Sequence, residues 1–205
     1  MEPILKVENL TKVFSRAGQE DFTAVNSICF NLSPGECLGI IGESGSGKTT
    51  AVNMITRLLD ATEGSILLDG EEITHLKGRE LRKVYRKMQM VFQTPTDSFD
   101  PRRTLGDGIG ESLRNIGVSR KETREEVERL LGKCGLPADF ADRYPHQVSG
   151  GQCQRAAIAR ALAVKPRLLI CDEATSALDV TVQKEILELL NELRSQQGNS
   201  LSILF

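Results

Sequence analysis

Apolar residues recur at short spacing in two segments near the start of the chain, residues 4–14 and 23–32. Both segments contain β-branched and aromatic side chains that favour strands over helices, namely Val7, Val13, Val25, Ile28 and Phe30. A shorter apolar run at 66–68 ends in an Asp-Gly turn and predicts another strand. The chain is therefore expected to open with a β layer.

Two later runs are apolar on both faces, which is typical of strands buried in a parallel sheet. The first run is residues 37–41, which follow a turn at 33–36, and the second is residues 167–171. A further strand is expected to begin near Ser200. These runs predict a central parallel sheet.

The segments between these strands show helical spacing. Apolar positions three or four residues apart follow Lys48 at 52, 55 and 59, and recur over 182–193 in a helix expected to end at Gly198. Ser119 and Glu122 have the spacing of a capping box, followed by a buried stripe at 127–134 and a stop at Gly135. A largely helical insertion is therefore predicted between Lys48 and Ser149.

Composition and charge narrow the class of protein. The 205 residues are 40% apolar, and 26 basic against 28 acidic residues give no overall field that would favour nucleic acid. No apolar run approaches the roughly 18 residues of a membrane span, and the start lacks the layout of a secretory signal. A soluble, intracellular protein is expected.

The basic residues at 79–87 are interpreted as a solvated helix face, because Glu80 interrupts them.

The cysteines and histidines predict neither a disulfide framework nor a metal site made of protein nitrogens. The five cysteines are scattered and never form a C-x-x-C pair, so reduced and mostly buried thiols are expected. His75 and His146 stand alone, without the spacing that places two imidazoles on one helical face.

The strongest chemical signal is the glycine-rich segment 42–49, which lies between a predicted strand and a predicted helix. Its glycines let successive backbone N–H groups converge on a phosphate, and the helix adds its positive dipole end. Lys48 is expected to reach the β- and γ-phosphates, and Thr49 to ligate Mg²⁺. The expected nucleotide contacts are Gly42, Glu43, Ser44, Gly45, Ser46, Gly47, Lys48, Thr49 and Thr50.

The order of strands and helices around this segment predicts the fold class. We expect an α/β fold with a P-loop NTPase core, a mostly parallel sheet, an N-terminal antiparallel β layer and a helical insertion subdomain.

Asp172 and Glu173 directly follow the second buried run. A carboxylate at the carboxyl end of a parallel strand can face the ligand crevice, so Asp172 is a candidate Mg²⁺ ligand. Glu173 is a candidate general base for an attacking water. The alternative is that both acids cap the next helix.

Residues 149–152 begin a small-residue helix, whose unpaired N–H groups and serine hydroxyl predict a second anion site. The candidate contacts are Ser149, Gly150, Gly151 and Gln152. Because one nucleotide has one γ-phosphate, this second site is expected to act on a nucleotide bound by another copy or by a partner chain.

In this order, the motifs resemble the ATP-binding subunit of an ATP-binding-cassette (ABC) transporter over nearly the whole chain. Lys48 and Thr49 match the family's Walker A motif, residues 149–152 match its signature, and residues 172–173 match Walker B. The resemblance implies that Lys48, Gln93 and Glu173 are catalytic. It further implies that Thr49, Gln93 and Asp172 hold Mg²⁺.

The same resemblance implies two further nucleotide contacts and a division of the chain. Residues 176–179 match the family's D-loop, and Asp179 is expected to contact ATP. Phe14 is expected to lie under the adenine, with Phe22 as runner-up and a core phenylalanine as the alternative. One ABC ATPase domain is expected over 1–205, with the core and β layer at 1–92 and 160–205 and a helical signature subdomain at 93–159.

Residues 92–102 and 144–149 are similar to segments of the dipeptide, oligopeptide and nickel importer ATPases. A Pro- and Asp-rich turn is the alternative for the first segment. The branch implies solute import driven by closure of a head-to-tail dimer with a second ATPase subunit. Permease subunits and, indirectly, a solute-binding protein are the implied partners at the cytoplasmic face of the membrane, without nucleic acid.

In the family, a histidine that contacts the γ-phosphate follows the strand that begins near Ser200, and the sequence stops at Phe205. Neither His75 nor His146 matches that position. If the 205 residues are the whole molecule, the protein is expected to bind ATP and to hydrolyse it weakly, which leaves a non-hydrolysing ATP clamp as an alternative. A DNA-associated cassette ATPase is another alternative. It is opposed by the lack of sustained heptads between the glycine-rich segment 42–49 and the signature at 149–152.

Overall fold

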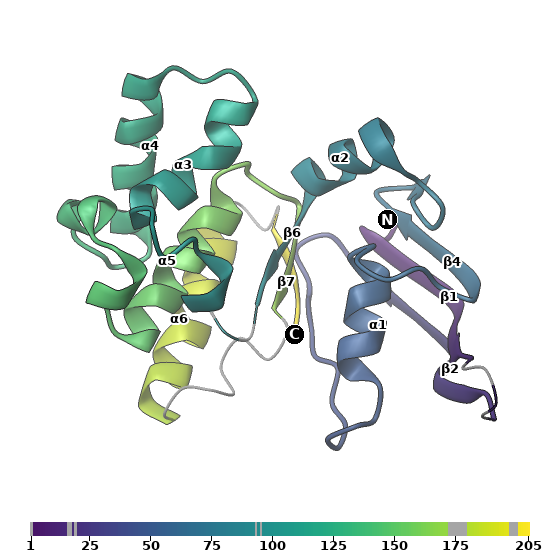
Figure 1. The fold of residues 1–205 in the computed structure, drawn as a ribbon. Helices are drawn as coiled ribbons and strands as arrows, with labels where there is room; N and C mark the ends of the chain where they lie inside the picture. Colours follow the sequence, from purple (N-terminus) through teal and green to yellow (C-terminus); the bar gives the residue numbers. More distant parts are fainter. Residues whose placement is uncertain are drawn as a thin grey trace.

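The computed structural model describes residues 2–15, 18, 20–92, 94, 96–171, 180–196 and 201–205. Its strands form two sheets, with helices packed around both (Figure 1). The α/β class and the two kinds of sheet are as predicted.

The first sheet is the predicted antiparallel layer. It contains β1 (Leu5–Phe14), β2 (Phe22–Leu32), β4 (Glu63–Leu68) and β5 (Glu71–Glu72), in the order β2-β1-β4-β5. The Asp-Gly turn joins β4 to β5, and both of its residues have positive φ, 54° at Asp69 and 77° at Gly70. Such a turn matches the twist of the strands that it connects.

The second sheet is parallel, and its two central strands are buried on both faces. It contains β3 (Cys37–Leu38), β6 (Met88–Val91), β7 (Leu168–Cys171) and β8 (Ser202–Leu204), in the order β3-β8-β7-β6. All four residues of β7 are buried, and they alternate between the two hydrophobic clusters of the protein. The prediction of a buried strand is confirmed for 168–171, while Arg167 is exposed and precedes the strand.

The expectation for residues 37–41 is wrong in part. Only Cys37 and Leu38 form a strand, and Ile41 is 97% exposed. Within the described residues β3 pairs with β8 alone, so it lies at the edge of the sheet. An edge strand has a neighbour on one side only, and an apolar run does not reveal which strand of a sheet takes that place.

The two hydrophobic clusters assign helices to the two faces of the parallel sheet. On one face, β7 and β8 share a cluster with α1 (Lys48–Ile55) and the antiparallel layer. On the other face they share a cluster with α5 (Gly150–Leu162) and α6 (Val180–Gln196). Figure 1 shows this arrangement, with α1 between the two sheets.

The predicted helical insertion packs against α5. It contains α3 (Leu105–Asn115) and α4 (Arg120–Lys133), with short 3₁₀ turns η1 (Thr96–Ser98), η2 (Ala138–Asp142) and η3 (Pro145–Gln147). The capping box of α4 is present, since the Glu122 N–H donates to Ser119 Oγ (3.3 Å) and the Ser119 N–H donates to Glu122 Oε2 (3.2 Å). Helix α5 runs through residues 159 and 160, where the predicted subdomain boundary lies.

Helix α2 (Gly78–Lys87) exposes four of its five basic residues, as predicted for a solvated face, and the fifth, Lys87, is half-buried. Arg79, Arg82, Lys83 and Arg86 are exposed, and Val84 is the buried residue of the helix. None of the helices in the described part of the chain has the length and apolar character that crossing a membrane requires.

Three of the five cysteines are buried, in line with the expected reduced and mostly buried thiols. Burial raises the pKa of Cys153 to about 11 and that of Cys134 and Cys171 to about 12. These thiols are therefore protonated packing groups at neutral pH. Cys29 and Cys37 are exposed.

Candidate nucleotide-binding site

Three of the predicted site segments follow strands that end at one edge of the parallel sheet. Leu38, Leu204, Ile170 and Met90 form a row of sheet partners, one from each strand. Because the strands are parallel, their carboxyl ends lie at the same edge, which is where parallel α/β sheets bind ligands. The segments 42–49, 93 and 172–173 follow three of these strands within a few residues.

The glycine-rich loop has a backbone that requires glycine. Gly47 is the N-cap of α1 and has φ +90°, and Gly45 has φ +81°. A Cβ at Gly47 would lie 2.3 Å from the carbonyl oxygen of Ala24 in β2. The loop is thus fixed against the antiparallel layer, with the predicted order of strand, loop and helix.

The Lys48 side chain reaches back to the start of this loop. Its Nζ donates to the carbonyl oxygens of Gly42 (2.7 Å) and Glu43 (2.8 Å). An ammonium group has three N–H donors, so one is left for a phosphate oxygen. No acidic residue lies in the first turn of α1, and the positive end of the helix dipole is therefore not neutralised locally.

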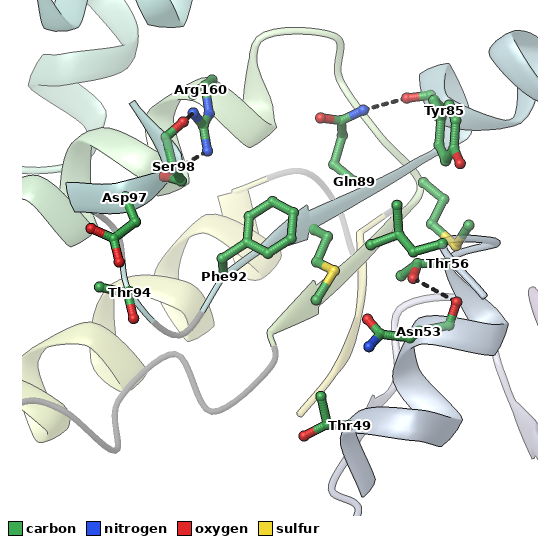
Figure 2. A pocket seen from close by; sticks show the side chains of 13 residues that line it. Thr49, Asn53, Thr56, Tyr85, Gln89, Phe92, Thr94, Asp97, Ser98 and Arg160 are labelled. Atoms are coloured by element: carbon green, nitrogen blue, oxygen red, sulfur yellow. Dashed lines mark hydrogen bonds between the residues drawn. The ribbon is translucent and has the colours of Figure 1, made fainter. Parts of the chain in front are cut away.

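Thr49 lines a cavity of about 680 Å³ that lies between α1 and β6. Figure 2 shows the Thr49 and Asn53 side chains on α1, with Phe92 and Thr94 across the cavity. Phe92 and Thr94 are the neighbours of Gln93 in the sequence. The structure therefore brings Thr49 to the same cavity as the chain on either side of the predicted Gln93 ligand.

Residues 149–152 form the exposed N-terminus of α5. Ser149 is the N-cap: its Oγ accepts from the Gln152 N–H (3.3 Å), and its own N–H donates to Gln152 Oε1 (2.9 Å). Since the hydroxyl is an acceptor in the cap, its proton remains available for a phosphate. Ser149 and Gly150 are exposed, so both can face another molecule.

Gly151 fixes this helix start against α6. A Cβ at Gly151 would lie 2.8 Å from Val182 Cγ1. The second predicted anion site is therefore held by close packing between α5 and α6, and no acidic residue lies in the first turn of α5.

Phe14 and Phe22, the two candidates for the adenine contact, are cross-strand partners in β1 and β2. Phe14 is 40% exposed and Phe22 is 63% exposed. Directly opposite residues of two paired strands share a face of the sheet. Both rings therefore lie on one face of the antiparallel sheet, with Phe22 two residues before Ala24 in β2. Their role in binding adenine stays a prediction.

Four predicted site residues lie outside the described residues: Gln93, Asp172, Glu173 and Asp179. The strands before three of them are described, since β6 ends at Val91 and β7 at Cys171, and these two residues are sheet partners. The roles given to the four residues stay predictions.

The motifs of the sequence did not single out Tyr85 and Arg160, which also line the cavity beside Thr49. Burial raises the pKa of Tyr85 and lowers the pKa of Arg160. One signal was present for Arg160, because an arginine interrupts a run of small apolar residues at 156–163.

Comparison with known proteins gives a family for this arrangement. A family model described as "ABC transporter" matches residues 25–176. The chain is 44% identical over 207 residues to the "Probable peptide ABC transporter ATP-binding protein y4tS" of Sinorhizobium fredii, an alignment that covers 98% of this chain and 59% of that protein. It is 45% identical over 203 residues to the "Oligopeptide transport ATP-binding protein AppF" of Bacillus subtilis, with coverage of 95% and 62%.

The chain thus spans about three fifths of the length of these two relatives, 59% and 62%. Among solved structures it is similar to the dimeric ATP-binding cassette MJ0796 in a post-hydrolysis state bound to ADP and Pi. The TM-score is 0.86 at 34% sequence identity, over 98% of this chain and 87% of that one.

Proposed function

The chain belongs to the ABC transporter family, and we propose that it is the ATP-binding and ATP-hydrolysing subunit of a peptide importer. The observation that carries this proposal is the row Leu38, Leu204, Ile170 and Met90, because the predicted nucleotide-binding and catalytic segments follow the strands of that row. The two relatives, a peptide and an oligopeptide transport protein by name, support the peptide class over nickel.

In this proposal, the loop 42–50 holds the triphosphate of ATP. Lys48 keeps two N–H groups on the carbonyls of Gly42 and Glu43 and turns the third to the β- and γ-phosphates. The open N-terminus of α1 adds backbone N–H donors and its dipole. Phe14 stacks on the adenine.

Mg²⁺ fits the oxygen donors of this site. Thr49 is exposed and lines the cavity, and Asp172 and Gln93 would supply the further oxygen ligands. Within the described ranges no group of three or more His, Cys, Asp or Glu residues has metal-binding spacing. Mg²⁺ takes oxygen ligands, usually one or two protein groups together with phosphate oxygens and water, and it would neutralise charge on the phosphates.

Glu173 accepts a proton from the attacking water, with Gln93 helping to orient that water. The water oxygen bonds to the γ-phosphorus while the bond from that phosphorus to the bridging oxygen breaks, so ADP leaves with the electron pair. Lys48 and the loop N–H groups stabilise the charge that develops.

The second half of the site comes from the opposing protomer. Ser149 to Gln152 and Asp179 of one chain contact the ATP held by Lys48 of the other, so that bound ATP closes a head-to-tail dimer. Support comes from the exposure of Ser149 and from the dimeric state of the similar cassette MJ0796. The second subunit is either a copy of this chain or a related ATPase.

The proposed partners in the membrane are permease subunits, served indirectly by a solute-binding protein. We place the permease contact at the cavity beside Thr49, where Leu58 (57% exposed) and Phe92 (40% exposed) present apolar surface. The chain would then work at the cytoplasmic face of the membrane, without nucleic acid.

The test is gel filtration of the Glu173→Gln variant with and without Mg-ATP, alongside phosphate release by the wild type. We expect an ATP-dependent shift to dimer in the variant and phosphate release only by the wild type. A dimer without any phosphate release by the wild type would identify a non-hydrolysing clamp. Absence of a shift, also after co-expression with a related subunit, would contradict the proposal.

A further inference from the structure

Arg160 joins α5, called here the signature helix because residues 149–152 begin it, to residues that line the cavity beside Thr49. It lies in the last turn of α5, the helix that begins after Ser149. Its guanidinium donates to the carbonyl oxygen and to Oγ of Ser98, the latter at 3.0 Å. Figure 2 shows this pair on the opposite side of the cavity from Thr49 and Asn53.

The same guanidinium also holds Phe99. Its carbon lies 4.4 Å from the centroid of the Phe99 ring, and a Cβ at Gly108 of α3 would lie 2.7 Å from that ring. Phe99 is therefore enclosed between α5 and α3, and it is 5% exposed. The planar fork of an arginine fixes both the direction and the spacing of such contacts, which a lysine cannot do.

Burying the charged guanidinium of Arg160 costs free energy, which an apolar side chain at this position would avoid. Arg160 is half-buried, and burial lowers its pKa. No carboxylate in the described part of the chain lies within ion-pair distance of it. Its hydrogen bonds go to one residue of η1. These hydrogen bonds offset the cost of burying the cation, and they fix that turn to α5.

We propose that Arg160 is a positioning residue that makes the segment Thr96–Phe99 move with the signature helix. The inference rests on the proposed function above. On one side the cavity is lined by α1, which begins in the proposed ATP-binding loop 42–50. On the other side it is lined by residues bonded to α5, which begins at the second anion site, 149–152. When ATP draws Ser149 toward the opposing protomer, Arg160 transmits that movement to the proposed permease contact.

The test is hydrogen exchange of the full chain with and without Mg-ATP, with Glu173→Gln present in every protein. We expect ATP to slow exchange in residues 42–49 and to change exchange in residues 96–99. With Arg160→Lys, the response at 42–49 remains, and the response at 96–99 falls about threefold or more. Arg155→Lys is the matched control, because Arg155 lies on α5 but bonds to Cys134 O (3.1 Å) and Glu185 (2.8 Å).

A purely structural role for Arg160 would speed exchange at 96–99 with and without nucleotide and leave the ATP-dependent difference intact. That result, or a wild type in which 42–49 responds and 96–99 does not, overturns the inference alone. If 42–49 does not respond in any protein, the proposed function fails and the inference fails with it. Should Arg160→Lys not fold, Ser98→Ala removes the hydroxyl contact and is expected to reduce the response at 96–99, and an unchanged response overturns the inference.

Discussion

The backbone of Gly47 lies against the carbonyl oxygen of Ala24, at a distance where a Cβ would approach that oxygen to 2.3 Å. Gly47 also has φ +90°, whereas Gly45 has φ +81° and open space within 4 Å of the place that a Cβ would take. A side chain at either position would therefore be strained by the left-handed backbone, and only at Gly47 would it also clash with another part of the backbone. They form a matched pair for testing how the loop is held.

We expect Gly47→Ala to destabilise the protein by more than about 2 kcal/mol, because the left-handed backbone costs about 1–2 kcal/mol and the clash with a carbonyl comes on top. Gly45→Ala should cost about 1–2 kcal/mol. Urea unfolding followed by circular dichroism measures both values. Equal stability of the two variants would show that the contact with Ala24 does not fix the loop.

The head-to-tail arrangement predicts complementation between two defective chains. Lys48→Ala removes the phosphate contact of one side and Ser149→Arg blocks the other, so neither chain alone should release phosphate. In an equal mixture, half of the dimers contain one intact site out of two, and activity should return to at most about a quarter of the wild type. Mixing with wild type in the same ratios controls for exchange between dimers. No recovery, despite exchange, would place Lys48 and Ser149 at one site within a chain.

Much of the fold was predictable where the signal is local. Four apolar residues in a row indicated strand β7, and the spacing of Ser119 to Glu122 indicated the capping box. Both features depend on residues that are close in sequence. The candidate phosphate loop was predictable for the same reason, because its strand, glycines and helix are contiguous.

The remaining features depend on contacts between distant segments. Helix α3 contains three glycines, which disfavour a helix, yet a Cβ at Gly106 would lie 2.6 Å from Ala141 O and one at Gly110 would lie 2.6 Å from Thr123 Cγ2. Close packing thus offsets the glycines of this helix, whose one local signal is the N-cap at Thr104. Helix α1 ends at Ile55, before the predicted apolar position 59, and Arg57 has φ +61°. The cavity that unites Thr49 with Arg160 is likewise visible only in the folded chain.

Two capping boxes that share one hydrogen bond, from a helical N–H to the serine hydroxyl, separate helix stability from nucleotide contact. The serine hydroxyl accepts from the third helical N–H at 3.3 Å in both, at Ser119 and at Ser149. Ser119→Ala and Ser149→Ala should each cost about 1 kcal/mol of stability. In the Glu173→Gln background, only Ser149→Ala should also weaken the ATP-dependent dimer, as measured by gel filtration over a range of ATP concentrations. Equal dimerisation by both variants would argue against a phosphate contact at Ser149.

Helix α4 should lose support in acid. The Ser119 side chain holds the pKa of Glu122 below its ordinary value of 4.5, and the Arg124 side chain holds the pKa of Asp142 below 3.8. The latter pair joins α4 to η2 through two contacts, at 2.6 and 2.8 Å. A carboxyl group whose pKa is lowered by folding stabilises the folded state above its unfolded pKa, and this contribution is lost as pH falls through the folded value.

The urea midpoint is therefore expected to fall between about pH 5 and about pH 3, with part of that slope removed by Glu122→Gln and part by Asp142→Asn. Glu125→Gln is the control on the same helix, since Glu125 makes only a 4.0 Å contact with Lys121. Amide exchange in α4 should accelerate over the same pH range, after correction for the intrinsic rate, because the lost contacts hold its first turn and its link to η2. An unchanged pH slope in both test variants would mean that these two carboxylates are equally well paired in the unfolded chain.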